Sequence, residues 1–336
     1  MTVVIPAGVV THGPAGPTPA RRPGSIRRTS TLEATWPEGG AGKPMHVLGR
    51  ARDLCTPRDG ADPQLLGEAE IRAVIAADRA SVQLASVPAD ARIAALHDMR
   101  SGWRRRLAQA LASDAQSGSL AYYLLDDLSG VAFVSFYALE NWGDSSFRGE
   151  PTDAEGRDRR LHMVDICAGW QAGSSAYGTD ASPGAVPHSK PVPDLRIPED
   201  PWAWHALEEV QAAAARRARR VDVWREGDAL LVDAHFQDAG TTPDGGRIAA
   251  HEYTFTACID AASGRITDIT AVPQVLPFDE CPLAAGNARA LIGASVRDLR
   301  TVVNERLPGI EGCTHMNDAL RALAEVPILA RALAAD

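Results

Sequence analysis

Residues 219–236, RRVDVWREGDALLVDAHF, decide the fold class. Two runs of strand-forming residues flank Glu226-Gly227-Asp228, a turn sequence, so the stretch predicts a β-hairpin. In the next segment, HEYTFTACID (251–260), apolar and polar side chains alternate, which is typical of a strand with one buried face. The small-residue turn DAASG then leads into RITDITAV (265–272), which predicts a fourth strand.

Helical signals follow these four strands. Cys281-Pro282 indicates a helix start, because proline is favoured at the first helical position. Apolar residues then recur at the spacing of one buried helix face, at Val296, Leu299, Val303 and Leu307. Pro308-Gly309 ends that helix, and a last one is expected over HMNDALRALAEV (315–326). We therefore expect a unit of four antiparallel strands followed by two helices.

The same order of signals occurs earlier in the chain. IRAVIAADRASVQLASVP (71–88) corresponds to YTFTACIDAASGRITDITAVP (253–273), and AYYLLDDL (121–128) corresponds to CTHMNDAL (313–320). Such internal similarity predicts an α+β protein built from two diverged copies of the unit, a tandem repeat with pseudo-twofold symmetry. The expected organisation is a disordered tail (1–29), an N-terminal repeat (30–150), a long loop with a linker helix (151–217) and a C-terminal repeat (218–336).

Two charged stretches are expected to lie at the protein surface. DPWAWHALEEVQAAAA (200–215) is helix-like, so the overlapping arginine run ARRARR (215–220) predicts a solvated helix end, with an anion or nucleic-acid contact as the alternative. Asp126 and Asp127 could bind a metal, but adjacent carboxylates point apart on a helix, so capping or surface roles are expected for them.

Composition limits the class of protein. The net charge of −9 argues against a general nucleic-acid surface, and no run approaches the roughly 20 apolar residues that span a bilayer. The N-terminus has no positive charge ahead of its apolar part and is a poor signal peptide. Five cysteines without a close CxxC pair predict reduced thiols in a cytoplasmic protein.

The candidate site lies in the C-terminal repeat. His251 begins a strand, Cys281 begins a helix, and GCTHMND (312–318) places Cys313 and His315 across the start of another helix. A zinc or iron site needs about four nitrogen or sulfur ligands, and these four residues supply the right atoms. His162 and Cys167, in the long loop, could also reach the site.

Two other interpretations of these residues stay open. A cysteine and a histidine at a helix N-terminus can form a nucleophilic pair without a metal, because the helix terminus favours the thiolate. Cysteine is also among the most buried residue types, so simple packing roles are possible. The first repeat has Tyr122 and Tyr123 near the position of the Cys-x-His pair, which suits a single functional site in the second repeat.

Two family resemblances bear on this segment. ECP (280–282), LIG (291–293) and GCTHMND resemble a bacterial family known as domain of unknown function 2889, whose name implies no activity. The order of strands, cysteine, helix and Cys/His pair is similar to the U-type iron–sulfur scaffold proteins. That second resemblance implies that His251, Cys281 and the Cys313/His315 pair occupy ligand positions.

These observations lead to a functional expectation. The chain has no GxSxG elbow, GxGxxG fingerprint or HExxH motif, which argues against hydrolases, dehydrogenases and zincins of the common types. We expect a metal-dependent enzyme that acts on a small molecule, with a non-catalytic metal or ligand carrier as the alternative. An open metal coordination position beside a pocket would favour the enzyme, and a closed shell would favour the carrier. The sequence does not indicate the oligomeric state.

Overall fold

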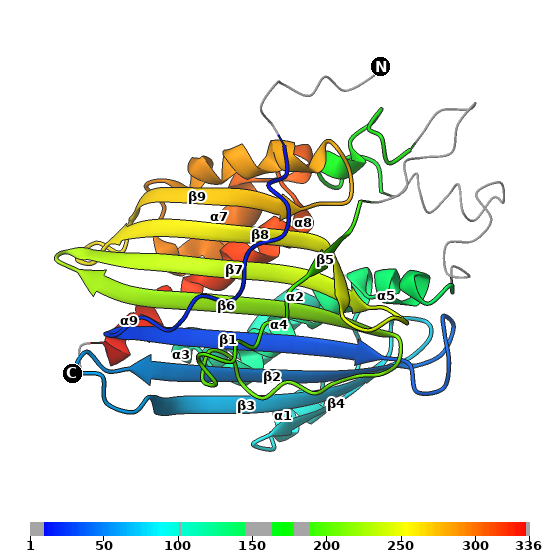
Figure 1. The fold of residues 1–336 in the computed structure, drawn as a ribbon, viewed down its shortest axis with the longest axis horizontal. Coiled ribbons are helices and arrows are strands. Elements are labelled where there is room, and N and C mark those ends of the chain that lie inside the picture. The colour runs from blue at the N-terminus through cyan, green and yellow to red at the C-terminus, as the bar shows by residue number, and fades with distance from the viewer. Residues whose placement is uncertain (1–9, 101, 145–162, 178–187, 334–336) are drawn as a thin grey trace.

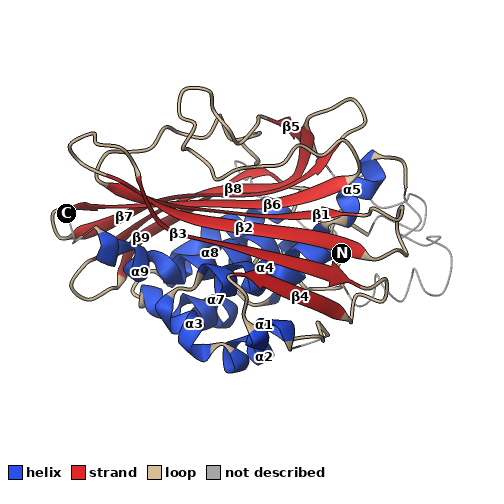
Figure 2. Ribbon diagram, turned by 90° about the horizontal axis from the view of Figure 1, so that it is seen from below, coloured by secondary structure: helices blue, strands red, loops and turns tan. Residues whose placement is uncertain are grey.

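The structure, a computed structural model, describes residues 10–100, 102–144, 163–177 and 188–333. These residues form an α+β architecture in which one antiparallel sheet of nine strands is covered by helices on one face (Figures 1 and 2). Loops and the N-terminal segment lie on the opposite face, which we call the open face. The predicted α+β class is therefore confirmed.

The strands follow a simple spatial order, β4-β3-β2-β1-β6-β7-β8, and β8 carries both β5 and β9 along its other edge. Every pairing is antiparallel. The strands are β1 (Ser25–Thr35), β2 (Met45–Thr56), β3 (Gln64–Ile75), β4 (Val82–Val87), β5 (Lys190–Val192), β6 (Ala214–Glu226), β7 (Ala229–Thr241), β8 (Arg247–Asp260) and β9 (Ile266–Val275).

Helices follow β4 and again follow β9. The first group is α1 (Ala91–Ala94), α2 (Trp103–Ala110), α3 (Ala112–Ser117), α4 (Leu120–Val134) and α5 (Phe136–Asn141). The second group is α7 (Leu299–Arg306), α8 (Thr314–Ala322) and α9 (Val326–Ala332), with the short 3-10 helices η3 (Cys281–Leu291), η4 (Val296–Asp298), η5 (Gly309–Glu311) and η6 (Leu323–Glu325) between them. One further 3-10 helix, η2 (Ala168–Trp170), lies in the long loop. Each group has more segments than the two helices that were expected.

The order of elements, four strands and then helices, thus occurs twice, and the first strands of the two groups, β1 and β6, pair at the centre of the sheet. This order agrees with the sequence pattern. The stronger prediction, that residues 30–140 and 218–330 superpose as one fold, stays a prediction.

Two apolar cores lie between the sheet and its helices. One joins β6–β9 to the C-terminal helices, and the other joins β1–β4 to helices α1–α5. In β8 the alternation has the expected result, because Tyr253 and Phe255 are buried on the helix side while Thr254 and Thr256 are only partly buried or exposed. The core is therefore made by residues that sequence alternation identified.

The arginine run is not a helix end. Residues 200–213 contain no helix, and the run lies in β6, where Arg216, Arg217, Arg219 and Arg220 are all buried. Alanine and arginine favour helices, which explains the wrong prediction. Here pairing with β1 and β7 prevails over that propensity, and strand alternation sends the arginines to both faces of the sheet.

The structure also differs from the prediction that residues 1–29 form a disordered tail. β1 begins at Ser25, before the expected repeat boundary, and residues 10–24 are bound to the open face. The His12 amide donates to the Pro273 carbonyl at 3.0 Å, and Arg21 forms an ion pair with Asp200 at 2.9 Å. A disordered tail up to residue 29 is wrong for the described residues. No helix in the described part of the chain is long and apolar enough to cross a membrane.

One buried histidine on the open face predicts a pH dependence of stability. His205 lies between the hydroxyls of Thr29 and Thr31, each 2.8 Å from one of its ring nitrogens. Burial, with Arg52 and Arg216 nearby, lowers the pKa of His205 from 6.5 to about 3. The unfolded chain therefore binds a proton between these values that the folded chain does not, so stability falls as pH falls through this window.

We expect this group to remove about 1.4 kcal/mol of unfolding free energy per pH unit below its unfolded pKa. Urea unfolding of the wild type and of His205→Gln between pH 7 and pH 4 measures the effect. The variant should be less stable at pH 7 and should show a flatter dependence on pH. Parallel pH profiles for the two proteins would contradict this account.

Candidate metal centre

Helix α8 brings its first turn against the sheet. Its N-cap is Cys313, in an extended conformation, and the helix begins at Thr314, so His315 and Asp318 are on the buried side of the first turns. Pro308 and η5 precede it, which agrees with the predicted end of the previous helix. The Cys-x-His pair therefore does span a helix start, as the sequence indicated.

His315 stacks on His251 of β8. The two ring centroids are 3.5 Å apart, with an interplanar angle of 20°. Asp238 of β7 is the cross-strand partner of His251, and its Oδ2 lies 3.8 Å from Nε2 of His315. One ligand atom from each of these three side chains lies within 4.8 Å of the other two, and all three are buried. In the described part of the chain, only this group of His, Cys, Asp and Glu is arranged closely enough to hold a metal ion.

The imidazoles of this group are held in their neutral form. Burial lowers the pKa of His251, with the neighbouring His315 and Arg217 adding to the effect, and burial and Arg217 lower that of His315. A neutral ring has a free nitrogen lone pair, which is what a metal ion requires. The Nδ1 atom of His251 is buried without a hydrogen-bond partner in the structure, which is costly for a polar atom.

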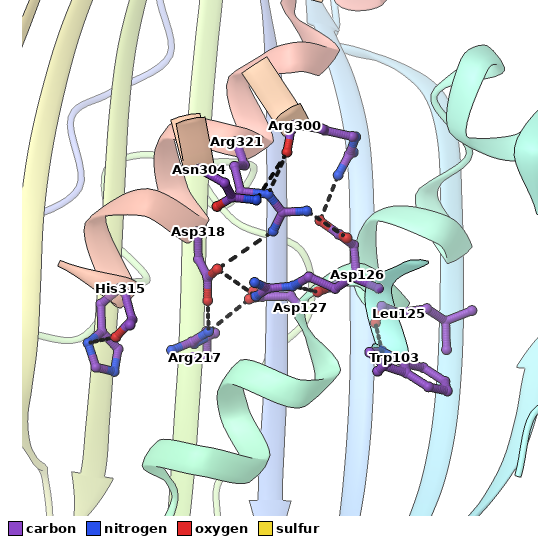
Figure 3. Close-up of polar contacts among 12 residues, drawn as sticks. Trp103, Leu125, Asp126, Asp127, Arg217, Arg300, Asn304, His315, Asp318 and Arg321 are labelled. Carbon is purple, nitrogen blue, oxygen red and sulfur yellow. Dashed lines mark hydrogen bonds and ion pairs between the residues drawn. The ribbon is translucent and has the colours of Figure 1, made fainter. Parts of the chain in front are cut away.

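Asp238 is fixed by Arg217 of β6. Nε and Nη2 of Arg217 donate to the two oxygens of Asp238 at 2.8 and 2.9 Å. Its Nη1 donates to Asp127 at 2.9 Å and to Asp318 at 3.1 Å (Figure 3). The guanidinium contacts helix α4 closely, because a Cβ atom at Gly130 would overlap it. Burial raises the pKa of Asp238 to about 6, against the opposing effect of Arg217.

The acidic pair of α4 belongs to this buried network. Asp126 and Asp127 are only 5% and 4% exposed, so the expected surface role is wrong. Asp126 accepts hydrogen bonds from Arg300 at 2.6 Å and Arg321 at 3.2 Å (Figure 3). Asp127 also accepts one from Arg219 at 2.6 Å. Burial alone would raise the pKa of Asp126, yet the surrounding arginines hold it below its ordinary value. Neighbouring carboxylates do point apart here, but each points to arginines.

Three buried thiols lie near one another, and one of them is next to His315. Cys313 Sγ is 3.9 Å from Nδ1 of His315, and the thiols of Cys167 and Cys281 are close enough to Cys313 to interact with it electrostatically. Cys167 reaches this place because the amide of Ala168 donates to the Gly312 carbonyl at 2.9 Å. Burial raises the pKa of all three thiols, that of Cys167 to about 12. They are therefore protonated near neutral pH.

The predicted site residues thus divide into two neighbouring groups. His251 and His315 come together as expected, while Cys281 and Cys313 join Cys167 outside the group that could hold a metal ion. His162 lies outside the described residues. Asp238 was missed, although one signal was available. Asp238 is two residues from the buried Phe236 and therefore faces the same side of β7. A carboxylate on an apolar strand face is costly unless it is paired with a cation or binds a metal ion.

Comparison with known proteins agrees with the first resemblance. Residues 215–329 match the family described as "Protein of unknown function (DUF2889)". The matched segment, the C-terminal part of the chain, contains Asp238, His251, Cys281, Cys313 and His315. No curated protein and no solved structure matches the chain. The resemblance to U-type iron–sulfur scaffolds stays a prediction.

The Arg217 network supports a prediction about stability. Replacing Arg217 with methionine leaves three carboxylates buried without their shared cation, so we expect the unfolding free energy to fall by about 3–5 kcal/mol. Arg289→Met is the matched control, because its pairing with Asp268 at 3.8 Å is exposed and should be worth less than about 1 kcal/mol. Urea denaturation measures both. Similar losses in the two variants would mean that the network contributes little.

Proposed function

We propose that this protein binds a divalent transition metal ion, zinc or iron, through Asp238, His251 and His315. The observation that carries the proposal is the convergence of one carboxylate and two imidazoles within 4.8 Å in the buried interior. Two histidines and one carboxylate are a ligand set used for zinc and for non-haem iron(II). Sulfur ligation through Cys281, which the sequence favoured, receives less support than ligation through Asp238.

The surroundings of the three side chains support metal binding over plain packing. A bound ion would give the buried Nδ1 of His251 the partner that it lacks. Metal ligands are commonly oriented by a second layer of hydrogen bonds, and here Arg217 fixes both oxygens of Asp238. On the far side of the His315 ring, Thr314 Oγ1 lies 3.3 Å from Nδ1 and can fix the tautomer.

The small size of the cavity beside the site favours a non-catalytic metal-binding role over catalysis. A cavity of about 10 Å³ adjoins Asp238 and is lined also by Tyr137 and Ala250. That volume holds about one water molecule and no organic substrate. Because no organic substrate fits beside it, the site suits a structural or carried metal better than a catalytic one. The proposed role is thus a metal-binding protein of the non-catalytic, carrier type.

A metal-dependent enzyme acting on a small molecule is the second candidate. The ligand count favours it, because three protein ligands leave one coordination position that a water molecule could occupy. The metal-free Cys–His nucleophile is less well supported. The Cys313 thiol lies beside His315, but burial raises its pKa, whereas an activated thiol needs a lowered one.

Two further proposals accompany the metal site. The five free cysteines support a reducing, cytoplasmic location. The repeated element order supports an origin by tandem duplication, in which only the second copy has the Cys-x-His pair, Cys313 and His315.

Metal content of purified variants tests the proposal. Wild-type protein stripped with a chelator and reloaded with Zn²⁺ should bind one ion per chain. His251→Ala and His315→Ala should lose more than about 90% of it, because removing a ligand weakens binding well beyond the 10–100-fold of an outer-shell change. Cys281→Ser should keep its metal, and His97→Ala, an exposed histidine, is the surface control. Elemental analysis gives the result.

Two outcomes would contradict the proposal: wild-type protein that binds no metal, or histidine variants that bind as the wild type does. Loss of metal in Cys281→Ser would instead support the sulfur ligand set. Azide added to the cobalt(II)-loaded protein separates the two functions. A coordination position that solvent can reach accepts the anion and changes the visible spectrum, whereas a position shut off from solvent leaves the spectrum unchanged.

A further inference from the structure

A second cavity lies on the open face of the sheet, on the side away from the metal centre. Its volume is about 250 Å³, and it is covered by residues 15–19 of the N-terminal segment and by Asp194 and Leu195. Figure 1 shows the N-terminal segment crossing strands β8, β7 and β6 in front of the sheet. Two contacts fix this cover. Thr18 donates to the Leu195 carbonyl at 2.7 Å, and the Ala15 amide donates to Glu252 at 2.9 Å.

The floor of the cavity contains a buried carboxylate. Glu252 of β8 is 1% exposed and accepts hydrogen bonds at 2.8 Å from Nε2 of His235 and from Nε2 of Gln237. No arginine or lysine of the described residues contacts it. A buried carboxylate is normally paired with a cation, and Glu252 has only the imidazole.

His235 presents its second nitrogen without a partner. Because Glu252 accepts, Nε2 of His235 carries the proton, and in the neutral ring Nδ1 is then a hydrogen-bond acceptor. The side chain is 10% exposed and lines the cavity, and within the described part of the chain no group bonds to Nδ1. A ligand that donates a hydrogen bond would satisfy it.

The charge of the cavity wall is negative. Asp194 pairs with Arg196 at 2.7 Å, and Asp233 pairs with Arg220, which is itself held between Asp233 and Asp222. Glu252 is therefore the one carboxylate of this wall for which no arginine partner is found among the described residues. Asp233 is 43% exposed and has one oxygen bound to Arg220, so its other oxygen can accept a hydrogen bond. The remaining wall includes apolar surface, from Pro17, Pro19 and Leu195.

We propose that this cavity binds a short aliphatic amine in its protonated form. The ammonium group would supply the positive charge that Glu252 lacks and would donate hydrogen bonds to Nδ1 of His235 and to the free oxygen of Asp233. Its methylene groups would pack on the two prolines and Leu195. A cavity of about 250 Å³ has room for an ammonium group and a chain of several methylene groups.

The test uses 1,4-diaminobutane as the probe and succinate as an anion of similar length. Isothermal titration of the wild type at low salt should give a Kd for the diamine of about 1 mM or tighter, with no heat from succinate. Asp233→Asn and Glu252→Gln should each weaken diamine binding at least about tenfold, because each removes one full charge from the site. Asp268→Asn, an exposed carboxylate on β9, is the matched control and should bind as the wild type does.

Several outcomes would overturn the proposal. They are the absence of diamine binding at about 10 mM, equal binding of succinate, or unchanged diamine binding in Asp233→Asn. Asp233 is partly exposed, so its variant remains informative even if the buried Glu252→Gln fails to fold. Diamine binding to the wild type should be the same before and after zinc loading, which separates this site from the metal centre.

Discussion

The structure depends on one buried cation. Arg217 lies at the centre of the sheet and binds carboxylates from three different elements, Asp127 of α4, Asp238 of β7 and Asp318 of α8. Removing four charged groups from water is expensive, and such a cluster is tolerable only when every group is paired with good geometry. The constraint therefore fixes the two helices relative to the sheet and, at the same time, fixes the carboxylate of the candidate metal site.

This constraint also explains the division of the core. Arg217 and its carboxylate partners form a buried charged layer between the sheet and the helices. The two apolar clusters lie on either side of this layer, one beneath each half of the sheet. Arg28 extends the layer on β1 by bonding Asp53 and Glu325, so residues from both halves of the chain share it. The two halves thus interact through matched charges, which specify direction and distance in a way that apolar contacts do not.

The sequence predicted the parts of the molecule that depend on local pattern. Alternation in residues 251–260 identified the buried face of β8, and the helix start at GCTHMND identified His315 as a residue near the site. What failed depended on partners far along the chain. The arginines of β6 resembled a helix end because their carboxylate partners, such as Asp127 and Asp318, are about a hundred residues away. Asp238 was missed for the same reason, since its pairing with His315 and Arg217 exists only in the folded chain.

The central claim is that the metal is held by nitrogen and oxygen atoms and by none of the nearby thiols. X-ray absorption at the zinc edge of the zinc-loaded protein tests this most directly. The account predicts a first shell of nitrogen and oxygen near 2.0–2.2 Å that contains two imidazoles. A sulfur scatterer at about 2.3 Å would contradict it, because Cys281, Cys313 or Cys167 would then be a ligand in place of Asp238.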